Sequence, residues 1–141
     1  MKLVIDNSVV MRWLFNDGSE ADREYAKKIA SLVETHDVFV PALFVPEAAN
    51  VISRALKAKA ISKVDAARCF DLIDDMAATV TPPDDTSAVM QLTLRAFEDN
   101  LSAYDASYLL LAENLNCALA TLDQDLRKAA VKRGVAVACW P

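Results

Sequence analysis

Short apolar runs alternate with longer amphipathic stretches along the whole chain. The short runs suit buried strands, whereas the longer stretches repeat apolar residues every three or four positions, as one face of a helix does. Strands are predicted at residues 2–6, 37–40, 79–81, 117–121 and 135–139. Helices are predicted at residues 8–15, 19–35, 44–58, 62–78, 86–99, 102–115 and 125–133. No repeat, low-complexity tract or linker interrupts the pattern, so we expect one domain over residues 1–141.

This alternation predicts the fold class. Strands separated by helices need crossover connections, which make a mostly parallel sheet with helices on both faces. We therefore expect an α/β fold, a three-layer α/β/α sandwich. The predicted helix at 102–115 is apolar on nearly all sides and should be buried. In such sheets, functional sites form beyond the carboxyl ends of the strands, and candidate chemistry is sought there.

Composition excludes several classes of protein. The chain has 141 residues, 54% apolar and 25% charged, as in an ordinary globular domain. The only glycines, Gly18 and Gly134, lie far apart, which excludes a glycine-rich phosphate loop. His36 is the single histidine, and no HExxH or GxSxG motif occurs. The three cysteines are widely spaced, which indicates reduced thiols. No apolar run is long enough to span a bilayer, and the N-terminal run does not resemble a signal peptide. We expect a cytoplasmic protein with no membrane contact.

Four carboxylates occupy positions where chemistry is expected. Asp6 ends the first predicted strand and Asp123 follows the fourth, so both should lie at the carboxyl edge of the sheet. Glu47 and Asp105 lie on the apolar faces of predicted helices. A charge on a buried face is costly unless it is paired or metal-bound, and no lysine or arginine is close to Glu47 or Asp105 in the sequence.

Each of these carboxylates also has a simpler interpretation as a helix cap or first-turn acid. Ser102 and Asp105 have the spacing of a capping box, and either Asp123 or Asp125 could cap the last helix. Capping does not explain why the acids share one edge of the fold. Gathered carboxylates repel one another, and a hard divalent cation relieves that repulsion. Oxygen ligands without histidine or cysteine favour Mg²⁺ or Mn²⁺ over zinc.

The segments that carry these acids are VIDNSV, PEAANVI, SAYDASYLLLA and LATLDQDL. Taken in this order over nearly the whole chain, they resemble the PIN-domain ribonucleases, specifically the VapC-type toxins of bacterial toxin–antitoxin pairs. The YDA segment on an apolar helix is the most specific of the four.

The resemblance implies a Mg²⁺-dependent endoribonuclease in which Mn²⁺ can substitute, leaving 5′-phosphate and 3′-hydroxyl ends. The implied catalytic and metal-binding carboxylates are Asp6, Glu47, Asp105 and Asp123. Asp125 is a second candidate for the last ligand position, and we favour Asp123. The implied supporting polar residues are Ser8, Asn50 and Thr121. Whether one or two metal ions act stays open, and we expect Asp105 or Asp123 to orient or deprotonate the attacking water.

The net charge of −5 argues against a uniformly basic surface, but basic residues cluster locally. The candidates for RNA contact are Arg12, Arg54, Lys57 and Lys59, with Lys63 and Arg68 nearby. A second cluster lies at residues 127–133. Such clusters can follow an RNA backbone, or they can be solvated helix faces and charges favoured at a helix C-terminus.

The resemblance further implies two protein partners, a second copy in a homodimer and an antitoxin that fills a groove. Trp13, Leu14 and Phe15 could line that groove or simply pack the first helix on the core. Rival functions are a haloacid-dehalogenase-like phosphatase or receiver domain, a non-catalytic RNA- or protein-binding domain, and a structure-specific DNA nuclease. The phosphatase interpretation fits poorly because Ser8 stands where a second acid is needed.

Overall fold

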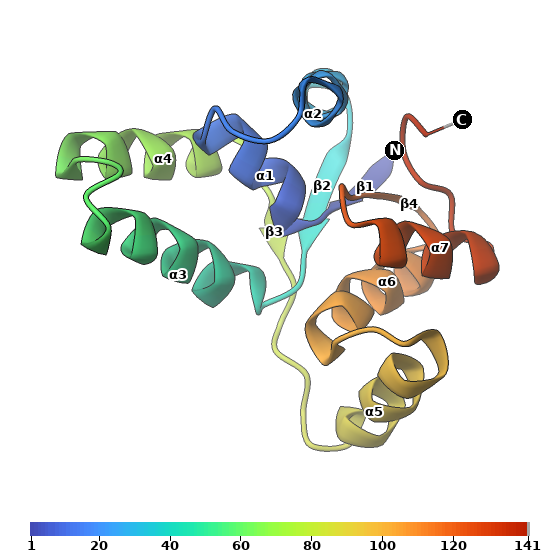
Figure 1. Ribbon diagram of the computed structural model, residues 1–141. Helices are drawn as coiled ribbons and strands as arrows, with labels where there is room; N and C mark the ends of the chain where they lie inside the picture. The colour runs from blue at the N-terminus through green and yellow to red at the C-terminus, as the bar shows by residue number, and fades with distance from the viewer. Residues whose placement is uncertain (141) are drawn as a thin grey trace.

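The structure, a computed structural model, describes residues 1–140, and within them the chain forms four strands and seven helices (Figure 1). The strands are β1 (Lys2–Ile5), β2 (Asp37–Val40), β3 (Thr79–Val80) and β4 (Ala118–Ala120). The helices are α1 (Asn7–Leu14), α2 (Glu20–Val33), α3 (Phe44–Lys57), α4 (Lys63–Asp75), α5 (Ala88–Asp99), α6 (Ala103–Leu115) and α7 (Gln124–Lys132). Every helix lies where the apolar periodicity predicts one.

All strand pairs are parallel, in the order β3-β2-β1-β4. Leu3 of β1 lies opposite Val38 of β2 on one side and Ala118 of β4 on the other. The ladder continues past β1, because the backbone N–H of Asp6 donates to the carbonyl of Ala120 at 2.9 Å. The carboxyl ends of β1 and β4 therefore lie side by side, which brings the segments after them together.

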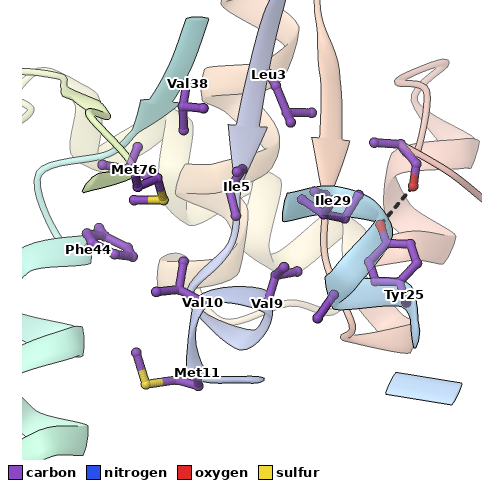
Figure 2. Close-up of a cluster of buried hydrophobic side chains, with 14 of the residues drawn as sticks. Leu3, Ile5, Val9, Val10, Met11, Tyr25, Ile29, Val38, Phe44 and Met76 are labelled. Atoms are coloured by element: carbon purple, nitrogen blue, oxygen red, sulfur yellow. Dashed lines mark hydrogen bonds between the residues drawn. The ribbon is translucent and has the colours of Figure 1, made fainter. Parts of the chain in front are cut away.

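Alternation along β1 directs its side chains to opposite faces of the sheet. Leu3 and Ile5 pack with Val9 and Ile29, from α1 and α2, in the core cluster of Figure 2. Val4 points the other way, into a second cluster formed largely by α6 and α7. These two cores on either side of one sheet confirm the three-layer α/β/α prediction, and α6 is buried as expected.

The prediction of a fifth strand at residues 135–139 is wrong. Val137 forms only an isolated bridge with Leu119, and the chain turns at once through Ala138 and Cys139. Cys139 has a positive φ of 54°, which lies outside the extended region of a regular strand. Val135 and Ala138 are buried, so the segment contributes to the core, and it extends the sheet only by the two backbone hydrogen bonds of that one bridge.

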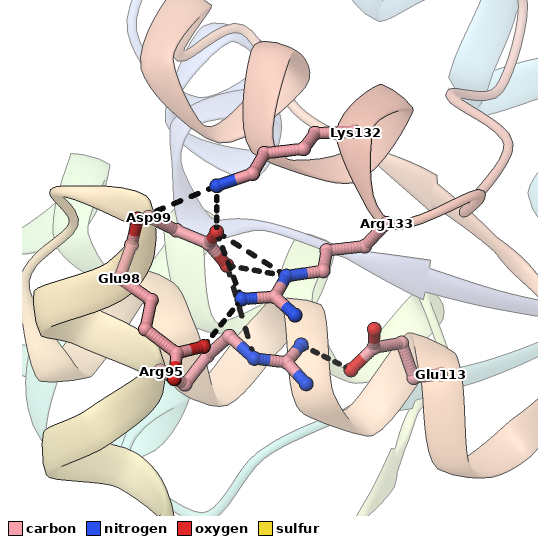
Figure 3. A network of polar contacts seen from close by, with 6 residues as sticks. All are labelled: Arg95, Glu98, Asp99, Glu113, Lys132 and Arg133. Carbon is pink, nitrogen blue, oxygen red and sulfur yellow. Dashed lines mark hydrogen bonds and ion pairs between the residues drawn. The ribbon is translucent and has the colours of Figure 1, made fainter.

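The second basic cluster is tied to the protein itself (Figure 3). Asp99 of α5 accepts ion pairs from Lys132 at 3.1 Å and from Arg133 at 3.0 Å, and Arg133 also pairs with Glu98 at 2.7 Å. Arg127 is buried. The interpretation of residues 127–133 as an RNA-tracking patch is therefore corrected, because most of these charges join α7 to α5 or lie inside.

No helix in the described part of the chain is both long enough and apolar enough to cross a lipid bilayer.

Candidate active site

Asp6 is the most buried of the candidate carboxylates, with 5% of its surface exposed. It lies directly after β1, and its Oδ2 accepts hydrogen bonds from the hydroxyls of Ser8 and Thr121, each at 2.7 Å. Burial raises its pKa above 3.8, the two hydroxyls act in the opposite direction, and the charge of Asp123 raises it further. Asp6 makes no side-chain cap to α1, so the capping interpretation fails at this residue.

Glu47 approaches from the first turn of α3. Its Oε1 accepts a hydrogen bond of 2.7 Å from the phenol of Tyr108, a fully buried residue of α6. Burial raises the pKa of Glu47, and the negative charges of Asp6 and Asp105 raise it further, against the lowering effect of the Tyr108 hydrogen bond. Glu47 is therefore under the influence of the charges of both aspartates.

Asp105 can be compared with two other aspartates in the same local sequence. At α2 and α4, Ser19 with Asp22 and Ser62 with Asp65 form complete capping boxes, in which each aspartate returns a bond to the serine backbone. At α6, Ser102 accepts from the Asp105 N–H at 3.0 Å, but the reciprocal bond to its backbone is absent. The capping box is thus only half formed at α6, which leaves the carboxylate for another role.

The charges around Asp105 indicate that its carboxylate belongs to the acidic site. Burial raises its pKa, and the charges of Asp6 and Asp123 raise it further, with a smaller contribution from Asp125. The Ser102 hydroxyl offsets part of this. Asp105 therefore faces the same acidic region as Asp6.

Asp123 and Asp125 lie at the start of α7. Asp123 caps the helix, since its Oδ1 accepts from the Leu126 N–H at 2.8 Å, so the capping interpretation holds here. It also contributes to the raised pKa of both Asp6 and Asp105. Asp125 is exposed and pairs with Lys128 at 3.8 Å. This arrangement supports Asp123 over Asp125 as the fourth member of the site.

The residues present fit a hard divalent cation by their chemistry. The ion pairs within residues 1–140 include none of the four carboxylates. Burial raises the pKa values of Asp6, Glu47 and Asp105, and repulsion from neighbouring carboxylates raises them further. Their donors are all oxygen, as Mg²⁺ and Mn²⁺ prefer. In the side-chain positions seen here, no three acidic, histidine or cysteine residues of the described chain converge closely enough to hold one ion. An ion would have to draw the carboxylates together.

The supporting polar residues behave differently from one another. Ser8 and Thr121 bind Asp6, and the Ser8 hydroxyl also accepts from the Leu122 N–H at 3.0 Å. Asn50 is exposed on α3, about one turn beyond Glu47, and no hydrogen bond among residues 1–140 joins it to the carboxylates. The structure brings Ser8 and Thr121 into the site and leaves Asn50 at its margin.

A groove of about 600 Å³ adjoins the acidic region. Its walls include Ser8, Arg12, Phe15, Val51, Ala55, Leu122 and Asp123. Arg12 is held there by an ion pair of 2.6 Å with Asp17. Trp13 and Leu14 pack against the core, as the simpler interpretation of the WLF segment predicts, whereas Phe15 both packs and lines the groove.

Two residues that the sequence analysis did not assign to the site, Tyr108 and Arg127, form hydrogen bonds to residues of the site. Tyr108 lies three residues after Asp105 and therefore on the same helix face, which was the available signal. Arg127 donates from Nε to the carbonyl of Thr121 at 2.8 Å. From the sequence alone, Arg127 is only one member of the basic cluster at residues 127–133.

Comparison with known proteins gives consistent results. The model of the PIN domain family matches residues 3–132. A VapC ribonuclease of Mycobacterium bovis is 34% identical over 123 residues, which cover 86% of this chain and 85% of the relative. Ribonuclease VapC9 of Mycobacterium tuberculosis matches with the same identity and coverage. The crystal structure of PAE2754 from Pyrobaculum aerophilum has a TM-score of 0.62 at 22% identity, covers 91% of this chain and 84% of that chain, and shows the same fold.

Proposed function

The chain belongs to the PIN-domain family, with VapC ribonucleases among its relatives, and we propose that it is a metal-dependent endoribonuclease that acts as the toxin of a toxin–antitoxin pair. The observation that carries the proposal is that the Thr121 hydroxyl bonds to both Asp6 and the Asp123 N–H at the adjoining ends of β1 and β4. No lysine or arginine of residues 1–140 pairs with either carboxylate, and the charge of Asp6 also raises the pKa values of Glu47 and Asp105. Residues 1–141 would act as one nuclease domain.

The four carboxylates would hold Mg²⁺, or Mn²⁺ in its place. When bound, the ion supplies charge neutralisation at the scissile phosphate and lowers the pKa of the attacking water. Asp6 is fixed by two hydroxyls and Glu47 by one, so both are suited to hold the ion. Asp105 does not complete its capping box, so its carboxylate can orient or deprotonate the attacking water.

The RNA backbone would follow α3. Arg54, Lys57 and Lys59 are exposed along the end of this helix and just beyond it. The helix begins near Glu47, and seven residues at about 1.5 Å each put Arg54 roughly 10 Å from it along the axis, which is within reach of neighbouring phosphates. Arg12 faces the groove, but it must leave Asp17 before it can bind a phosphate.

The partner proposals have local support. An antitoxin segment would occupy the groove beside Arg12 and Phe15. A second copy would cover α5, whose side chains Met90 and Phe97 are 66% and 84% exposed despite their size. Three free cysteines accord with the reducing cytoplasm.

A cleavage assay on total cellular RNA tests the proposed function. Reactions with Mg²⁺, Mn²⁺ or EDTA would compare the wild type with Asp6→Asn and Asp105→Asn. Asp65→Asn is the matched control, because Asp65 occupies the same Ser-x-x-Asp position on a helix that carries no site residue. We expect discrete, metal-requiring fragments from the wild type and the control, and none from the two site variants.

Single-stranded and flap-structured DNA would be tested in the same assay. Cleavage of DNA alone would replace the RNA proposal with a DNA nuclease. Metal binding with no cleavage of either polymer would indicate a binding domain. Cleavage that survives in EDTA or in Asp6→Asn would contradict the metal-dependent site.

A further inference from the structure

Arg127 is a charged residue that the proposed chemistry does not use. It is 9% exposed, although it lies on α7 only four residues after Asp123. Its guanidinium carbon lies 3.8 Å from the ring centroid of Trp140 and 4.7 Å from that of Tyr25. Burying a charge is costly, and these two ring faces with one carbonyl are what compensate for it among the described residues.

The carbonyl that Arg127 binds belongs to Thr121, a residue with two further hydrogen bonds. Arg127 Nε donates to the Thr121 carbonyl at 2.8 Å. The Thr121 hydroxyl donates to Asp6 at 2.7 Å and accepts from the Asp123 N–H at 3.1 Å. The Arg127 guanidinium therefore holds the backbone of the residue whose hydroxyl joins Asp6 and Asp123.

Segments far apart in the sequence hold Arg127 in place. Tyr25 comes from α2, and its hydroxyl donates to the carbonyl of Ala138 at 2.8 Å. Trp140 follows two residues later, and its ring meets that of Tyr25 edge to face, with centroids 6.4 Å apart. Trp140 thus contacts Arg127, and Arg127 binds Thr121 of the acidic site.

We propose that Arg127, Tyr25 and Trp140 form a clamp that positions the Thr121–Asp123 loop for metal binding. The clamp touches neither substrate nor ion; it acts through Thr121. This inference rests on the proposed function, since it concerns the affinity of the same acidic site for its ion.

Two measurements on the full chain test the clamp. The first is Mg²⁺ and Mn²⁺ affinity by calorimetry, and the second is hydrogen exchange of the Leu122 and Asp123 amides in the metal-free protein. Trp140→Ala and Arg127→Lys should weaken metal binding by about tenfold, as the loss of residues supporting metal ligands does, and should speed exchange. Trp140→Phe keeps an aromatic face, so it should retain most of the metal affinity and most of the protection from exchange.

Ile73→Ala separates this effect from general destabilisation. Ile73 packs in the core from α4, which carries no site residue, so this variant should lose thermal stability without losing metal affinity. Asp6→Asn should abolish metal binding.

The inference is overturned if Trp140→Ala and Arg127→Lys bind the ion as the wild type does while Asp6→Asn does not. The proposed function would then stand without the clamp. It is also overturned if Trp140→Ala and Ile73→Ala lose the same amount of thermal stability and Trp140→Ala then loses no more metal affinity than Ile73→Ala does. A wild type that binds neither ion overturns the proposed function and this inference with it.

Discussion

The phenol of Tyr108 donates a hydrogen bond to Glu47, a residue 61 positions earlier in the chain. The bond joins α6 to α3 directly behind the acidic site. Burial and the carboxylate partner both raise the pKa of Tyr108, so the phenol stays protonated and remains a donor. Asp105 lies one turn earlier on the same helix, and α6 therefore carries both a site carboxylate and the group that orients a second one.

Tyr108→Phe removes this donor with little change in shape. We expect a stability loss of about 1–2 kcal/mol, because the half-buried Glu47 carboxylate loses a hydrogen bond. Metal affinity should also fall, since Glu47 becomes free to rotate. Urea denaturation and calorimetry measure the two effects. Tyr104→Phe is the control on the same helix, where the side chain is 65% exposed, and it should change neither. Equal behaviour of the two variants would contradict a role for Tyr108 at Glu47.

The acidic site should make the stability of the metal-free protein depend on pH. The pKa values of Asp6, Glu47 and Asp105 are raised, so the folded protein holds these protons more tightly than the unfolded chain does. Their stabilising contribution is therefore complete below the ordinary values of 3.8 and 4.5 and is lost as pH rises through the raised values.

Asp6→Asn tests the part of this contribution that depends on the Asp6 charge. The lowered pKa values of Asp65, Asp85 and Asp99 act in the opposite direction, but they do so in both proteins and cancel in the comparison. At pH 7 without metal, we expect the variant to be about 1–3 kcal/mol more stable than the wild type, since a buried unpaired charge is gone. The difference should vanish below pH 3.8. Saturating Mg²⁺ should raise the Tm of the wild type only. A variant that is less stable at pH 7 would show that Asp6 is stabilising without an ion.

The basic residues at the end of α3 and just beyond it should contribute to RNA affinity in proportion to their number. Lys57→Ala with Lys59→Ala should weaken RNA binding in EDTA, measured by fluorescence anisotropy. The slope of log K against log salt should become shallower by roughly 0.7 for each lysine that contacts a phosphate. Lys132→Ala is the matched control, because Lys132 is already paired with Asp99. It should cost stability and leave the slope unchanged. An unchanged slope in the double variant would place the RNA elsewhere.

Local pattern predicted every helix and the parallel sheet, because apolar periodicity reports which face of each element is buried. It failed at residues 135–139, where Val135 and Ala138 are buried in the core but the segment pairs with β4 at a single bridge. Asp6 and Asp123 were predictable from the ends of their strands. The Tyr108–Glu47 bond and the Arg127 clamp were not, since each joins segments far apart in the sequence. A lysine or arginine count also cannot distinguish a solvated charge from one buried against aromatic rings.

The three Ser-x-x-Asp helix starts provide a comparison within one chain. Asp22→Asn and Asp65→Asn each disrupt a complete capping box, so each should lower the thermal stability slightly and leave metal affinity unchanged. Asp105→Asn disrupts only half a box and removes a half-buried charge whose neighbours repel it, so the metal-free protein should keep or gain stability while metal binding fails. Thermal denaturation with and without Mg²⁺ measures both quantities in all three variants. If Asp105→Asn behaves as the other two do, the aspartate of the YDA segment is a cap, and the acidic site loses the residue proposed to orient the attacking water.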